Sequence, residues 1–263
     1  MALLPFPGTP APYDGDPDDE SGADKMSFLE HLDELRKRLI VCVSALGVGF
    51  LISWIFVERL LDFIYTPLTA TIKGGVFQYT EPAEGFMLRM KLAALSGLFL
   101  ALPVVLWQIW RFVAPGLYAN EKRLAIPFVF LSTTFFTAGA AFSHYVAFPW
   151  TMSFFASFER PDMVFVPRIA PVFAMYVKML LAMGLVFEMP TAVYFLARVG
   201  LVTAGWLLKN FKYAVLVIFI FAAIFTPGTD LVSQLMMAGP MIVLYLLSVV
   251  IAWLVAPKQP TRE

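Results

Sequence analysis

The amino-acid sequence predicts an all-α polytopic membrane protein with six transmembrane helices. Of its 263 residues, 60% are hydrophobic and only 14% are charged, whereas a soluble domain averages roughly 25% charged residues. The apolar residues gather in six long runs, and most of these runs are long enough to cross a hydrocarbon core of about 30 Å. Lysine and arginine collect in alternate connections between the runs, which is typical of a protein with a fixed orientation in the bilayer.

Net charge and cysteine content exclude several other classes of protein. The formal net charge is zero, which argues against a surface that binds nucleic acid. The only cysteine, Cys42, lies within an apolar run, so an internal disulfide and a thiolate metal cluster are both excluded. We therefore expect no metal, no cofactor and no nucleic-acid partner.

Residues 1–25 are expected to form a disordered cytoplasmic tail. This segment contains five prolines and six acidic residues, and proline together with like charge disfavours packed structure. No basic segment precedes a short apolar core with a cleavage site, so we expect no removable signal peptide. The first apolar run should therefore remain as a membrane span.

A short charged helix is predicted over Ser27–Arg38, directly before the first apolar run. Ser27 and Glu30 have the spacing of a capping box, and acidic residues precede basic ones, as the helix dipole favours. By itself this pattern indicates a solvated helix whose basic end anchors the following span. Two pairs of side chains have the i,i+4 spacing of helical ion pairs, Asp33–Lys37 and Glu34–Arg38.

The apolar runs define one membrane domain over residues 26–256, followed by a cytoplasmic tail at 257–263. Pro103, within the second run, predicts a kink there. The fifth run has 13 residues, which at 1.5 Å per residue is only about 20 Å, so the fifth and sixth runs could instead form one shallow hairpin. The six runs are 39–57, 92–110, 124–150, 172–197, 213–225 and 231–256.

The distribution of lysine and arginine predicts the orientation. Twelve of the 19 lie in the N-terminal flank, in the short loops 111–123 and 198–212, and in the C-terminal tail. The other seven lie on the opposite face, which carries the longer polar loops 58–91 and 151–171, or at the entrances of its spans. The positive-inside rule then places both termini in the cytoplasm. The six tryptophans lie at or near run ends, where indoles prefer the membrane interface.

Polar side chains within the apolar runs are candidate functional groups. Glu188 lies in mid-run, where a carboxyl is expensive and faces a bundle interior or a wet cavity. It is either a hydrogen-bonded packing residue or a group that binds a partner or handles a proton. Gln234 and Asp230 form a second polar cluster beside a Pro-Gly turn, which could be turn chemistry alone. His144 has no second histidine nearby, so we expect a satisfied histidine rather than a metal ligand.

The loop 111–123 places Glu121 on the same membrane face as Glu34. The simplest interpretation is a basic loop that fixes the topology. Two carboxylates beside apolar side chains at the cytoplasmic interface could instead receive a peptide with two arginines. The planar guanidinium group matches a carboxylate bidentately, and the lysine ammonium does not.

Five segments of the chain resemble the signature segments of the TatC family, the multispan receptors of the twin-arginine protein translocase. They occur in the expected order, at span boundaries, and the resemblance extends from about residue 30 to residue 256. The turn 226–230 is one residue longer than the compact form TPPD of the family. The five segments are HLDELRKRLI (31–40), TPL (66–68), FVAPGLYANEKR (112–123), FEMP (187–190) and TPGTDLVSQ (226–234).

The resemblance implies a fold, a location and a set of partners. It implies a concave bundle of six spans in the cytoplasmic (inner) membrane, with both termini cytoplasmic and with short fifth and sixth helices. It implies transport of folded cargo, driven by the proton-motive force, without enzymatic activity. The implied partners are twin-arginine signal peptides, single-span TatA- and TatB-type subunits, membrane lipid, and further copies of this chain in a larger complex.

The resemblance also implies site residues. Glu34 and Glu121 would contact the two consensus arginines, and Arg36 and Phe112 would shape that site. Other matched positions have structural or intramembrane assembly roles: Pro67, Glu188, Asp230 and Gln234.

Two other functions remain open on the residues alone. A proton-coupled secondary transporter would also contain a buried carboxylate and broken helices, although the two halves show no convincing internal repeat. An intramembrane protease would need a Ser–His or a paired-Asp constellation, but His144 lacks such a motif and Asp230 has no matching aspartate in another span. Crosslinking of cargo to the face that carries Glu34 and Glu121 would separate these classes.

Overall fold

The structure is a computed structural model that describes residues 17–69, 77–113, 125–160, 162, 165–226 and 231–255. Within these ranges the regular structure is helical, which confirms the predicted all-α class. The chain divides into two compact units, residues 1–41 and residues 42–263. Each unit is described by itself, although helix α1 (Pro17–Ile55) contributes to both.

Helix α1 begins at Pro17 and so extends into the predicted tail, which the sequence pattern places up to residue 25. Proline at the first helical position and acidic residues in the first turn are compatible with a helix start. The span within α1 covers Leu32–Ile55, somewhat longer than the predicted run 39–57.

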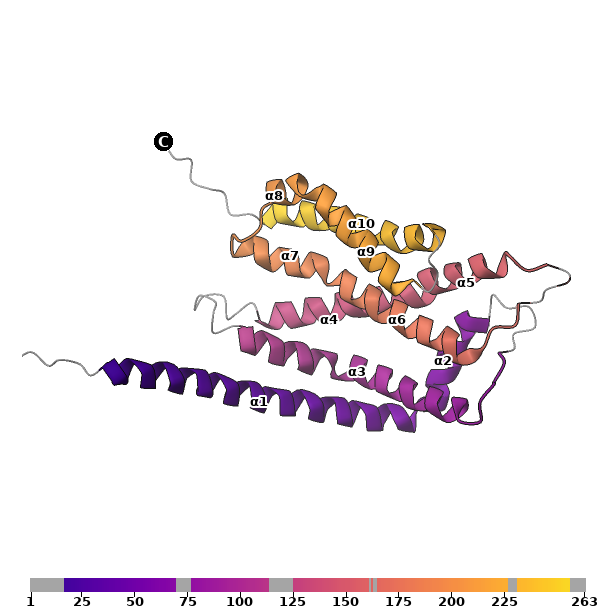
Figure 1. The fold of residues 1–263 in the computed structure, drawn as a ribbon, viewed down its shortest axis with the longest axis horizontal. Helices are drawn as coiled ribbons and strands as arrows, with labels where there is room; N and C mark the ends of the chain where they lie inside the picture. Colours follow the sequence, from indigo (N-terminus) through magenta and orange to yellow (C-terminus); the bar gives the residue numbers. More distant parts are fainter. Residues whose placement is uncertain are drawn as a thin grey trace, which may run out of the picture. The chain divides into compact units, whose positions relative to one another are not determined.

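The second unit is built on α3 (Glu84–Val113), α4 (Ala125–Phe142) and α6 (Ile169–Phe187). Helix α4 packs against both α3 and α6, and the three lie side by side in Figure 1. The close approach of α4 to α6 depends on Gly139, because a Cβ there would collide with the Met183 carbonyl. Gly139 therefore allows α4 and α6 to approach closely.

Helix α2 (Val57–Thr69) lies in the segment that the sequence analysis assigns to a polar loop, so that assignment is wrong. Its charged residues fall on the exposed side of a short amphipathic helix and interrupt any apolar run. Pro67 is half-buried in the last turn, where the chain is about to leave the helix. The buried face consists of Val57, Leu61, Ile64 and Leu68.

The third apolar run continues further than predicted. After α4 the chain forms a π-helical turn, η3 (Ser143–Ala147), and then α5 (Phe148–Ala156). The predicted loop boundary at residue 151 is therefore wrong, since the helix ends at Ala156. Proline near the N-terminus of α5 is tolerated because the first N–H groups of a helix lack intrahelical partners.

The remaining helices follow the predicted runs closely. Helix α7 (Met189–Arg198) continues the direction of the fourth run, and α8 (Ala204–Lys209) lies within the predicted basic loop. Helix α9 (Phe211–Phe225) has 15 residues and is short, as predicted. Helix α10 (Leu231–Val255) has 25 residues and is long enough to span, so the expectation of a short sixth helix is wrong.

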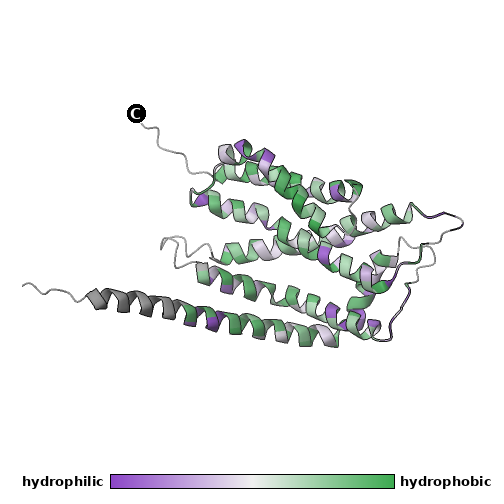
Figure 2. Ribbon diagram, viewed as in Figure 1, coloured by the Kyte–Doolittle hydropathy of each residue, from purple (hydrophilic) through white to green (hydrophobic). Residues whose placement is uncertain are grey.

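Five helices of the described residues are long and apolar enough to cross a membrane, and α9 is a shorter apolar helix. Figure 2 shows that the helices of the second unit are predominantly hydrophobic, with hydrophilic residues concentrated toward their ends. Large apolar side chains such as Phe130, Trp253 and Leu254 are 72%, 73% and 69% exposed, which is the surface that lipid covers. Trp110 lies near the end of α3, as its place at a run end predicts, and it is buried against neighbouring helices.

A small clamp joins the two predicted polar loops, 58–91 and 151–171. Gln78 and Arg168 form an isolated parallel β-bridge, in which the Ile169 amide donates to the Gln78 carbonyl at 3.2 Å. Arg168 also donates from Nε to the Thr80 hydroxyl at 2.9 Å, and the Thr80 amide donates to Glu84 at 2.9 Å. Both loops therefore lie at the same end of the second unit, as the predicted alternation of faces requires.

Candidate recognition helix and intramembrane polar site

The charged helix of the first unit carries two local ion pairs, one of which involves Glu34. Glu34 is half-buried and accepts a hydrogen bond from Arg38, and Asp33 pairs with Lys37 at 2.7 Å. Both predicted i,i+4 pairs are confirmed. The exposed Asp33–Lys37 pair contributes only about 0.3–0.5 kcal/mol, whereas Arg38 is largely buried and Glu34 is 42% exposed, so the Glu34 carboxylate remains accessible to a second guanidinium group. Arg36 is exposed on the same helix.

The second predicted part of the recognition site starts at the end of α3. Phe112 is half-buried there, beside the exposed Arg111. Glu121 lies outside the described residues, and so does Asp230. The joint action of Glu34, Phe112 and Glu121 therefore stays a prediction.

An aromatic cluster that the sequence analysis missed braces the end of α3 against α4 and α7. The ring centroid of Trp110 lies 4.6 Å from that of Phe128 and 5.3 Å from that of Phe195, and Phe128 and Phe195 are 4.7 Å apart. Aromatic pairs of this geometry contribute about 0.5–1.5 kcal/mol beyond burial. The cluster joins the end of α3 to α4 and α7. Its only sequence signal is a tryptophan at a run end, which equally well indicates an interface residue.

Glu188 lies at a break in the fourth span. It is both the C-cap of α6 and the N-cap of α7, and Pro190 follows within the first turn of α7. The proline ring removes one backbone donor and clashes with the preceding turn, so the helix cannot continue undisturbed. The break places the carboxyl at a point where the backbone itself is less fully hydrogen-bonded.

The Glu188 carboxyl has a polar but unsatisfied environment. Its Oε1 is buried and makes no hydrogen bond to any described residue, and the same holds for the hydroxyls of Ser132 and Thr191. Ser132, on α4, lies near the Glu188 carboxyl, but its hydroxyl does not have hydrogen-bonding geometry to it. A buried carboxyl in hydrocarbon without full hydrogen bonding is costly, so these groups form a site suited to a proton, water or a polar partner.

Gln234 has a different environment. Its Nε2 donates to the Phe219 carbonyl at 2.8 Å and so ties α10 to α9. This bond satisfies one donor of the side chain within the protein and supports the short apolar helix α9. Ser233, beside it, is fully buried.

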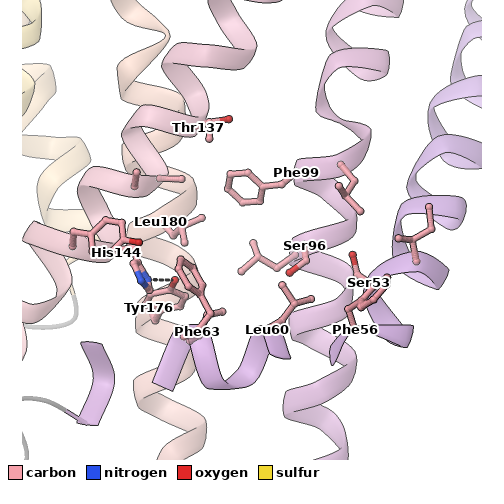
Figure 3. Close-up of a pocket in the computed structure, with 17 residues that line it drawn as sticks. Ser53, Phe56, Leu60, Phe63, Ser96, Phe99, Thr137, His144, Tyr176 and Leu180 are labelled. Atoms are coloured by element: carbon pink, nitrogen blue, oxygen red, sulfur yellow. Dashed lines mark hydrogen bonds between the residues drawn. The ribbon is translucent and has the colours of Figure 1, made fainter. Parts of the chain in front are cut away.

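His144 is satisfied, as predicted. It is 3% exposed on η3, and its Nδ1 shares a hydrogen bond of 2.9 Å with the Tyr176 hydroxyl (Figure 3). The ring of Phe63 stacks on it with centroids 4.4 Å apart. The described residues contain no group of three or more side chains arranged to hold a metal ion.

These arrangements occur in a chain whose sequence matches a known family model over residues 30–240, described as Sec-independent protein translocase protein (TatC). The chain belongs to the TatC family. It is thus a subunit of the Sec-independent, twin-arginine protein translocase, and its spans are those of a membrane protein of the Tat system.

Curated relatives and solved structures agree with this assignment. The Sec-independent protein translocase protein TatC of Koribacter versatilis is 40% identical over 242 residues, covering 90% of this chain and 89% of the relative. The TatC protein of Desulforapulum autotrophicum is 42% identical over 241 residues, covering 91% and 89%. A crystal structure of the twin arginine translocase receptor TatC superposes with a TM-score of 0.74 at 29% identity, covering 84% of this chain and 97% of that one.

Proposed function

We propose that this TatC-family protein is the non-enzymatic receptor that binds twin-arginine signal peptides of folded cargo at its cytoplasmic face. The observation that carries the proposal is Glu34, a partly exposed carboxylate that pairs with an arginine, Arg38, on the helix before the first span. A signal-peptide arginine replaces Arg38 as its partner and offers two parallel hydrogen bonds. Glu121 receives the second arginine, while Arg36 and Phe112 shape the site.

We further propose that the protein lies in the cytoplasmic (inner) membrane with both termini in the cytoplasm. The asymmetry of lysine and arginine between the two faces supports this orientation. The loops joined by the clamp at Gln78 and Arg168 then lie on the outer face.

The intramembrane polar group takes part in assembly and transport. Glu188 offers an unsatisfied carboxyl at a helix break, where a polar group of a single-span TatA- or TatB-type subunit or water can complete its hydrogen bonding. Pro67, in the last turn of α2, and Asp230 are positions that match the family's segments, and Gln234 ties α10 to α9. Transport itself draws on the proton-motive force and uses no nucleotide.

Photo-crosslinking tests the receptor function directly. A photoreactive amino acid at Phe112 should capture a twin-arginine precursor in membranes, and a twin-lysine precursor should be captured much less. The control is the same amino acid at Phe158, an exposed aromatic residue after α5. Equal capture at the two positions, or none at Phe112, would contradict the proposal and favour a small-solute transporter, which has no reason to contact a precursor protein.

A further inference from the structure

A cavity of about 540 Å³ lies within the second unit and is lined by none of the residues proposed for recognition (Figure 3). Its walls come from α1, α3, α4, η3 and α6, and Leu60 and Phe63 of α2 close it at one end. The volume falls in the range of about 300–1,000 Å³ that is typical of small-molecule sites. The cavity is open, and Leu100 at its mouth is 53% exposed. Since α1, α3 and α4 have the length and composition of spans, this mouth faces hydrocarbon.

A purely hydrocarbon occupant would leave a polar group of the cavity without a hydrogen-bond partner. Ser53, in the last turn of α1, lines the cavity and is only 2% exposed, yet its hydroxyl has no hydrogen-bond partner among the described residues. A buried hydroxyl without a partner costs about 1–3 kcal/mol. An occupant with an acceptor oxygen beside an apolar chain would satisfy it.

The positively charged side chain of Arg59 lies beside the same cavity. The guanidinium carbon of Arg59 lies 5.8 Å from the ring centroid of Phe56, and Phe56 lines the cavity. Glu58, its neighbour, is engaged by Arg89 at 2.8 Å, and no acidic side chain of the described ranges forms a salt bridge with Arg59. The span in α1 ends at Ile55, so Arg59 lies just beyond the hydrocarbon, at the depth of lipid headgroups.

We propose that this cavity binds one anionic phospholipid. An acyl chain fills the apolar space over α3, an ester carbonyl accepts a hydrogen bond from Ser53, and the phosphate group pairs with Arg59. A membrane-spanning helix does not fit, because a helix with its side chains is about 10–12 Å across and this volume holds little more than one turn. The apolar space, the Ser53 hydroxyl and the Arg59 guanidinium group follow one another in the same order as the acyl chain, the ester carbonyl and the phosphate of a phospholipid.

Native mass spectrometry of the full chain, released from detergent, tests the proposal. The probes are phosphatidylglycerol and phosphatidylcholine with identical acyl chains. The wild type should retain one phosphatidylglycerol molecule and prefer it to phosphatidylcholine by about fivefold, the ratio that corresponds to ~1 kcal/mol per basic side chain at a lipid surface. Arg59→Ala should abolish this preference, and Arg160→Ala, which removes a cation from the neighbouring loop, should keep it.

Two variants of one helix test occupancy of the cavity. Ala141→Phe puts a ring into the cavity and should remove the bound lipid, whereas Ala138→Phe, an exposed position of α4 outside the cavity, should leave it. Leu100→Trp at the mouth provides a second blocking variant if Ala141→Phe does not fold. Lipid retention unchanged by both blocking variants would overturn the proposal. So would a blocking variant that keeps its lipid but loses twin-arginine peptide, since the occupant would then be peptide.

Discussion

At the scale of single residues, Glu188 illustrates what the sequence can and cannot predict. Its depth in an apolar run is visible in the sequence, and the helix break follows from Pro190. Its unsatisfied neighbours Ser132 and Thr191 were not predicted, because hydrophobic periodicity indicates which face of a helix is buried but not which helix it meets. The ion pair of Glu34 with Arg38 could be predicted, because an i,i+4 pair depends only on residues of the same helix.

Replacing Glu188 by alanine should separate transport from recognition. We expect transport to fall by about tenfold or more, as for the loss of an interaction of ~1.4 kcal/mol, while twin-arginine peptide binding changes little. Glu188→Gln tests whether transport needs a group that can gain and lose a proton, because the amide of glutamine can still form hydrogen bonds but cannot be ionised. Lys178→Ala, an exposed charged position of the same span, is the control. The measurement is export of a twin-arginine precursor by membrane vesicles, and full export by the alanine variant would refute this role.

At the scale of helices, close packing depends on a few glycines. Helices α1 and α3 meet at Gly49 and Gly97, where a Cβ on Gly49 would lie 2.5 Å from the Gly97 carbonyl oxygen. The long runs could be predicted because about 20 apolar residues in sequence have one stable solution in a bilayer. The short helices α2 and α8 could not, because each carries its own charged residues and takes its stability from packing on the bundle.

Two glycines of α1 make a matched pair for testing this contact. Gly49→Ala should lower the free energy of unfolding by about 1–3 kcal/mol, the usual cost of overpacking. A Cβ at Gly47 meets nothing within 4 Å, so Gly47→Ala should be neutral or stabilising by up to about 1 kcal/mol, because alanine favours the helix. Thermal unfolding in detergent measures both. Equal melting temperatures for the two variants would mean that the helices do not meet at Gly49.

At the scale of the whole molecule, composition was sufficient to predict a membrane protein, and the motifs distributed along the chain were sufficient to predict the family. The proposed recognition site would bring a carboxylate of the charged helix together with side chains of a later loop, and no periodicity in a sequence encodes such a juxtaposition. The orientation rests on the charge asymmetry alone.

Thiol labelling of intact cells tests the orientation. In a Cys42→Ser background, Ser157→Cys should react with a reagent that cannot cross the membrane, and Lys209→Cys should react only after the membrane is opened. Both positions are exposed, so accessibility to solvent does not differ between them. The reverse pattern would invert the topology.

The most direct test of the receptor function is the preference for arginine over lysine in signal-peptide binding. Losing one partner of a hydrogen-bonded charge pair commonly costs roughly 2–5 kcal/mol, and the lower value already corresponds to about thirtyfold weaker binding. Glu34→Ala and Glu121→Ala should each weaken binding of a twin-arginine peptide to the detergent-solubilised protein. Asp33→Ala, which removes the neighbouring carboxylate paired with Lys37, should not.

The deciding quantity is the ratio of the dissociation constants of twin-lysine and twin-arginine peptides for the double variant Glu34→Ala/Glu121→Ala. If the two carboxylates read the arginines, this ratio should collapse toward one while the protein stays folded. If the double variant prefers arginine by the wild-type margin, the two residues do not recognise the arginines, and the helix of Glu34 serves only to anchor the first span.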